Sequence, residues 1–87
     1  MSDSIEHSLK IWPQYFADVQ SGKKNFEVRK NDRDFKEGDM LTLQEYCPDK
    51  KEYLGRFCWK KVTYVLKGGA FGIQEGFVVL GIDNYKI

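Results

Sequence analysis

The densest group of ionisable side chains in the sequence lies between Gly22 and Arg33. The alternation of a β-strand places Glu27 and Arg29 on one face, and Lys24 stands close enough before them to turn toward that face. A lysine, a carboxylate and an arginine that converge can hold a polar, planar ligand, because a guanidinium fork suits phosphate or base edges and a carboxylate accepts from an exocyclic amine. The same charges also fit a solvated edge strand whose ion pairs contribute little.

Other basic and aromatic residues are expected to extend this site along a nucleic acid. The basic residues that would steer an RNA backbone are Lys30, Arg33, Arg56, Lys60 and Lys61. The rings interleaved with basic residues, of which about half are expected to face the core, are Tyr46, Tyr53, Phe57 and Trp59. Exposed rings between cations are typical of surfaces on which bases stack. For Trp12, Tyr15 and Phe16, helical spacing favours core packing instead.

Length and composition limit the classes of protein. The chain has 87 residues and a formal net charge of +1, which predicts a single domain over residues 1–87 with room for one shallow site. Near-neutrality excludes a basic coat over the whole surface but permits a localised basic cleft, because residues 23–36 and 50–67 are each rich in lysine and arginine. No apolar run is long enough for a membrane span, and no secretory signal is recognisable.

The two cysteines and one histidine are too few for a typical zinc site, so we expect neither a metal nor another cofactor. Cys47 and Cys58 form no CxxC pair and are interpreted as reduced thiols in a cytoplasmic protein, with Cys58 acting as a small hydrophobe inside a strand. A disulfide between them, or a nucleophilic cysteine paired with His7, would require a proximity that spacing does not predict.

The elements that must position these residues follow from periodicity. Pro13 suits the first turn of a helix, which is expected to end at Gly22. Strands are predicted over residues 8–11, 25–29, 40–46, 56–66 and 77–82. The last of these is a continuous apolar run, as expected for a strand that is covered on both faces, and Gly81 inside it suits a bend or bulge.

One helix near the N-terminus and about five strands indicate an α+β domain. At this size the sheet is expected to curl into a small β-barrel with the helix over one opening, because closure removes exposed strand edges.

The order of two motifs resembles a known family. The signature Gly22-x-Lys24-x-x-Glu27-x-Arg29 follows a short helix and precedes Phe35-Lys-Glu-Gly38-Asp39-x-Leu41. With the run from His7 to Pro13 and the final Val-Val-Leu-Gly-Ile, this arrangement resembles the ASCH domains of the PUA-like superfamily, in their small single-domain bacterial and phage branch of unknown function. The resemblance covers nearly the whole chain.

The resemblance implies a PUA-like β-barrel and a cleft that binds RNA beside the signature, with Lys24, Glu27 and Arg29 as its residues and Gly22 as the turn that places Lys24. Some related members are amidohydrolases on N4-acetylcytidine that use a lysine, a threonine nucleophile and a downstream glutamate. Lys24 matches the lysine, but Glu27 stands at the position of the threonine. Glu75 is the available downstream acid.

The leading hypothesis is therefore a non-enzymatic module that binds single-stranded RNA or a nucleotide-like ligand. One alternative is a small amidohydrolase for acylated nucleosides, in which Lys24, Glu27 and Glu75 would be the catalytic candidates and Glu27 would act as a general base on water. The other is a protein-interaction module, which an exposed apolar patch would favour.

Overall fold

The structure is a computed structural model that describes residues 4–84. Its elements in chain order are β1 (Glu6–Ile11), α1 (Pro13–Ser21), β2 (Phe26–Lys30), β3 (Met40–Cys47), β4 (Glu52–Lys67) and β5 (Phe77–Asn84). The predicted helix and all five predicted strands are present. The largest difference is in β4, which begins four residues earlier than the sequence indicated because it forms a long hairpin arm with β3.

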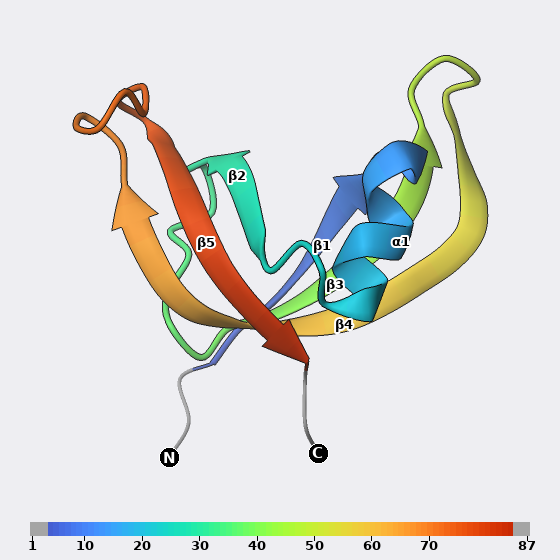
Figure 1. Ribbon diagram of the computed structural model, residues 1–87, viewed down its shortest axis with the longest axis horizontal. Helices are drawn as coiled ribbons and strands as arrows, with labels where there is room; N and C mark the ends of the chain where they lie inside the picture. The colour runs from blue at the N-terminus through green and yellow to red at the C-terminus, as the bar shows by residue number, and fades with distance from the viewer. Residues whose placement is uncertain (1–3, 85–87) are drawn as a thin grey trace.

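The five strands form one sheet in the order β1-β3-β4-β5-β2. β1 runs parallel to β3, and the other neighbours are antiparallel. Figure 1 shows that the sheet bends into a half-barrel and that α1 lies beside β3 at its open side. The α+β prediction is thus confirmed in outline. The ladder does not close, however, because β1 and β2 are both edge strands of the described sheet.

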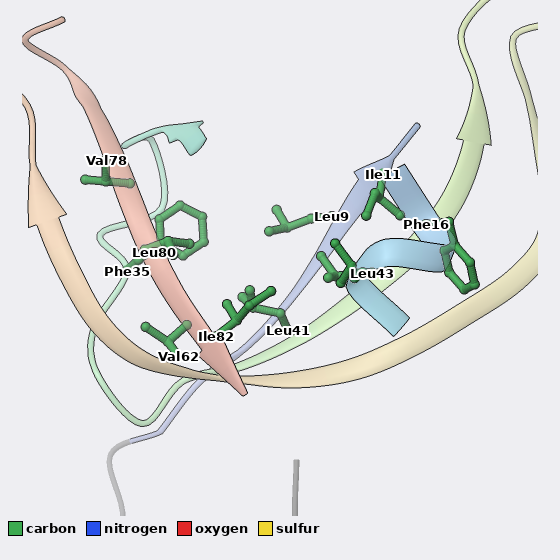
Figure 2. Close-up of a cluster of buried hydrophobic side chains, with 11 residues drawn as sticks. Leu9, Ile11, Phe16, Phe35, Leu41, Leu43, Val62, Val78, Leu80 and Ile82 are labelled. Atoms are coloured by element: carbon green, nitrogen blue, oxygen red, sulfur yellow. The ribbon is translucent and has the colours of Figure 1, made fainter. Parts of the chain in front are cut away.

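The core occupies the concave side of the half-barrel. Its buried side chains are Leu9, Ile11, Phe16, Val19, Phe35, Leu41, Leu43, Val62, Val78, Leu80 and Ile82. Figure 2 shows most of them pointing from the strands and the helix into the space that the sheet encloses. Alternate residues of each strand supply this core, as expected for a sheet with one buried face.

β5 departs from its prediction. Val78, Leu80 and Ile82 are buried, whereas Phe77 and Val79 on the opposite face are only partly covered. The strand is therefore covered on one face, not both. The reason is that the described chain has a single helix, which lies at the open side of the half-barrel, and no second layer for the convex face.

Gly81 allows a close approach between β5 and β4. The register shifts between Val62 and Tyr64, directly opposite Gly81. A Cβ at Gly81 would lie 3.0 Å from Thr63 Oγ1 and 3.3 Å from the Cβ of Tyr64. The irregularity expected at Gly81 therefore falls on the partner strand, and the glycine makes room for it.

A buried polar contact ties the start of β1 to the loop before β3. His7 Nε2 lies 2.8 Å from Asp39 Oδ2, and the same carboxylate accepts hydrogen bonds from the backbone N–H groups of Ile5 and Lys36. Burial alone would raise the pKa of Asp39, but the hydrogen bonds, led by that from His7, outweigh it and hold this pKa below its usual value. The aspartate of the FxxGDxL motif, Asp39, therefore has a structural role.

This contact predicts how stability depends on pH. Because the folded protein lowers the pKa of Asp39, the stabilisation is complete above the unfolded value of 3.8 and is lost as the pH falls through the folded value. Replacing Asp39 with Asn should lower the free energy of unfolding at pH 7 by about 1–3 kcal/mol. It should also flatten the loss of stability below about pH 4, measured by urea unfolding across that range.

The exposed Glu37 provides the matched control, because Glu37→Gln changes a neighbouring carboxylate without touching this contact. Equal acid profiles for Asp39→Asn and the unaltered protein would contradict the assignment.

Candidate functional site

Three ionisable side chains of the signature meet at one point. Lys24 Nζ donates a hydrogen bond to Glu27 Oε2 at 2.7 Å, and Arg29 Nη2 lies 3.4 Å from Glu27 Oε1. Glu27 is buried, while Lys24 and Arg29 are half-buried. The sequence predicted that Glu27 and Arg29 share a face. β2 is an edge strand, as the alternative interpretation expected, but its charged face is not solvated, because that face is turned toward the core and the apolar Phe26 and Val28 face outward.

Backbone geometry explains why these residues converge. Gly22 ends α1 with a φ of +87°, a conformation that side chains other than glycine rarely adopt. The chain then folds back, so that the N–H of Lys24 donates to Asp18 O at 2.9 Å and its Nζ donates to Phe26 O at 2.9 Å. Glu27 follows at the start of the strand, directly opposite the buried Leu80 of β5.

Arginine side chains span the gap between the two edge strands, which we call the seam. Arg29 Nη2 donates to Lys10 O, and Arg33 Nη1 donates to Ser8 O at 2.9 Å. Both acceptors are carbonyls of β1, two residues apart, and therefore lie on the same edge of that strand. The guanidinium groups thus satisfy backbone acceptors that direct pairing of β1 with β2 would otherwise use.

A pocket of about 550 Å³ lies in the seam and contains the converging charges. We call it the seam pocket; it is lined by Lys10, Ile11, Trp12, Tyr15, Lys24, Phe26, Glu27, Val28 and Arg29. β1, the start of α1 and β2 each contribute to its wall, so the two edge strands and the helix that joins them create it together.

Aromatic rings form much of the wall. Trp12 and Tyr15 are 49% and 43% exposed and stack on each other, with ring centroids 6.3 Å apart and planes 21° apart. Their predicted role in the core is wrong, because only Phe16 and Val19 of the helical stripe are buried. Trp12 precedes the first turn, and a helix of nine residues beside β3 turns only a narrow stripe toward the sheet.

The pocket carries more positive than negative charge. Lys24 Nζ lies 4.7 Å from the centroid of the Phe26 ring and 5.6 Å from that of Tyr15, within the range of cation–π attraction. Lys10 lines the rim and lies over the ring of Tyr46. Glu27 is the only acidic lining residue that the structure describes in this pocket, against three basic ones.

The remaining basic candidates lie outside the pocket. Lys30 is exposed on β2 and Arg33 spans the seam. Arg56 makes two hydrogen bonds to Glu45, of 3.0 and 2.8 Å, which raise its own pKa and lower that of the carboxylate. The prediction that Lys60 meets an RNA backbone is wrong, because Lys60 is 2% exposed and its Nζ donates to Asn84 Oδ1.

The candidate catalytic glutamates are separated. Glu27 is in the seam pocket, but Glu75 is exposed in the loop of residues 68–76 and does not line it. The expectation that about half of the β3–β4 rings face the core is also wrong. Tyr53, Phe57 and Trp59 are all exposed and Tyr46 is half-buried, because these rings project from the convex face and the hairpin arm.

Both cysteines are free thiols. Burial raises the pKa of Cys58; Lys60 opposes the shift and Glu27 adds to it. Cys58 packs partly against the core, as predicted. Within residues 4–84, no three side chains of histidine, cysteine, aspartate or glutamate come together in a way that would hold a metal ion.

Sequence reasoning missed six of the lining residues of the pocket: Lys10, Ile11, Trp12, Tyr15, Phe26 and Val28. One available signal was the position of Trp12 immediately before Pro13, outside the helix proper. The register of β2 was the other, since Phe26 must face outward once Glu27 faces the core. That choice depends on tertiary packing, because alternation fixes which residues share a face and leaves open which face is buried.

Comparison with known proteins gives two matches. The family model described as "Domain of unknown function (DUF3850)" matches residues 6–82, which include every element except the end of β5. A protein of Escherichia phage P2, the "Uncharacterized 12.9 kDa protein in GpA 3'region", is 45% identical over 40 residues. The match spans 46% of this chain and 37% of the phage protein.

The charge cluster predicts coupled effects on stability. Replacing Glu27 with Gln should lower the free energy of unfolding by about 1–3 kcal/mol, because two cations then lose a buried acceptor. In that background, replacing Lys24 with Met should cost about 1 kcal/mol less than it does alone. A double-mutant cycle measured by urea unfolding tests this, and strictly additive effects would contradict the contact.

Proposed function

The chain belongs to the DUF3850 family, and we propose that its seam pocket binds a nucleotide-like ligand or a short single-stranded RNA. One observation carries this proposal: Lys24 and Arg29 meet the buried Glu27 in a pocket whose wall includes three half-exposed aromatic rings. A base needs a flat apolar surface and polar groups at its edge, and a phosphate needs cations. The pocket contains all three.

Each group has a role that its chemistry supports. Trp12 and Tyr15 provide an already stacked pair of rings on which a base can continue the stack. Glu27 accepts hydrogen bonds and therefore selects a base that presents an amine. Lys24 and Arg29 pair with that carboxylate and have further N–H groups that can donate to ring acceptors or to phosphate.

We also propose that the half-barrel is PUA-like and related to ASCH domains. Support comes from the signature around Glu27, the helix before it and the curled five-stranded sheet. The two free thiols support a cytoplasmic location. None of the helices among residues 4–84 is long and apolar enough to cross a membrane.

The binding proposal predicts a salt-dependent affinity for RNA. A pool of short fluorescent RNAs should bind at low salt, and the binding constant should fall as salt rises. Arg29→Ala and Lys24→Ala should each weaken binding by about tenfold, and Trp12→Ala by a similar factor through lost stacking. Fluorescence anisotropy measures these affinities.

Lys50→Ala is the matched control, because Lys50 is an exposed lysine in the β3–β4 turn, outside the pocket. It should change affinity by less than about twofold. No binding at low salt, or full affinity in Arg29→Ala, would overturn the proposal.

The second candidate is hydrolysis of an acylated nucleoside, favoured by the 2.7 Å contact between Lys24 and Glu27. Glu27 would take a proton from water, whose oxygen then bonds to the acetyl carbon of N4-acetylcytidine. The carbon–nitrogen bond breaks, the proton passes to the departing amine, and acetate and cytidine result. Lys24 would polarise the carbonyl.

This reading predicts that the protein releases cytidine from N4-acetylcytidine and that Glu27→Gln lowers the rate by about 10²-fold or more. Glu75→Gln should retain the full rate, because Glu75 lies outside the pocket. Chromatography of the products decides between the two candidate functions. If the unaltered protein releases cytidine no faster than Glu27→Gln does, hydrolysis is rejected, and this result does not count against the binding proposal.

A further inference from the structure

The convex face of the sheet is apolar across three neighbouring strands. Val28 of β2 lies opposite Val79 of β5, which lies opposite Leu66 of β4. In the adjacent row, Gly81 separates Phe26 from Tyr64. Residues that pair directly across strands project from the same face, so these side chains form one continuous surface. We call it the outer patch; its members are Phe26, Val28, Tyr64, Leu66, Phe77 and Val79.

This surface remains in contact with solvent. Phe26, Val28 and Tyr64 are 44%, 55% and 60% exposed, and the other three members are partly exposed. The sequence of β5 is apolar on both faces, which is typical of a strand with a layer on each side. The fold supplies only one of those layers. Contiguous apolar patches of roughly 300–600 Å² are often functional surfaces.

The chemistry of the patch favours a protein over a nucleic acid. Its central row, Val28, Val79 and Leu66, is aliphatic. Bases stack on rings and need neighbouring cations for the backbone, whereas aliphatic side chains without charges between them pack against other aliphatic side chains. The charged residues stand at the edges: Lys24 over the ring of Phe26, Lys30 beside Phe77, and Asp83, the next outward residue of β5 after Gly81, with Lys61 paired directly opposite it on β4.

We propose that the occupant is a second copy of this chain, packed face to face across a two-fold axis. An uncharged centre complements itself. When the two β5 strands run antiparallel across the interface, Lys30 of each copy faces the end of the other that carries Lys61 and Asp83, where Asp83 is the counter-charge. A self-complementary patch is the requirement of an isologous dimer.

The exposed area agrees with this occupant. The six side chains together expose roughly 400 Å², taking about 150–250 Å² for a whole large side chain. Two facing patches would then bury about 800 Å² of apolar surface. Because about 60% of an interface is apolar, the complete interface would be about 1,300 Å², which lies within the range of specific complexes.

The dimer lies beside the seam pocket, since Phe26 and Val28 belong to both the patch and the pocket wall. Tyr64, Leu66 and Val79 do not line the pocket. Substitutions at these three positions therefore separate self-association from ligand binding.

Sedimentation equilibrium of the full chain without RNA tests the proposal. The protein should form dimers with a Kd on the order of 10 μM. Tyr64→Lys should raise that Kd by about tenfold or more, because it places a cation in the apolar patch. Trp59→Lys, at a comparably exposed ring on the other half of β4, should leave the Kd unchanged. Circular dichroism and urea unfolding establish that each variant is folded, and Leu66→Gln replaces Tyr64→Lys if the latter is not.

Charge reversal tests the antiparallel arrangement. Lys30→Glu and Asp83→Lys should each weaken the dimer, and the double variant should restore it to within about twofold of the original Kd. A protein that stays monomeric at about 1 mM overturns the proposal. So does an equal effect of Trp59→Lys and Tyr64→Lys, and so does loss of RNA binding in a monomeric Tyr64→Lys, which would make the patch a nucleic-acid surface.

Discussion

The rest of the structure depends on the seam between β1 and β2, where the sheet does not close. Backbone carbonyls at a strand edge need donors, and here Arg29 of β2 and Arg33 of the loop after β2 supply them. A guanidinium group reaches much farther than a backbone N–H. The two edges therefore stand apart, and the space between them is the seam pocket. A closed ladder would have removed the exposed edges and the pocket with them.

The signature residues form one physical unit. Glu27 stands in the core-facing row of β2, opposite Leu80, where a lone carboxylate would be costly. Lys24 and Arg29 approach its two oxygens from opposite sides along the chain. Gly22 turns the chain so that Lys24 can do so. The GxKxxExR spacing is thus explained by the burial of one carboxylate, and the proposed binding would use the same contacts.

Local signals in the sequence predicted the elements well. Pro13 and Gly22 bound the helix as expected, because both residues act through their own backbone dihedrals. Predictions failed where they depended on which face of a helix or strand is buried. Tyr15 and Lys60 depend on which side of a helix or strand meets the sheet, and only the curvature of the half-barrel decides that. The convergence at Glu27 was predicted as a shared face, but its burial was not.

The half-barrel has one concave side and fills it with the core, so the fold itself gives no reason for apolar residues on the convex side. The arrangement there is ordered. Two rows of outward-facing residues run across β2, β5 and β4, and Gly81 interrupts only the row that ends at Tyr64, beside the bulge of β4. Packing inside the chain would be as good with polar residues at Val28 and Tyr64. Their apolar character is what the proposed dimer requires, and the seam pocket lies at the edge of that proposed contact.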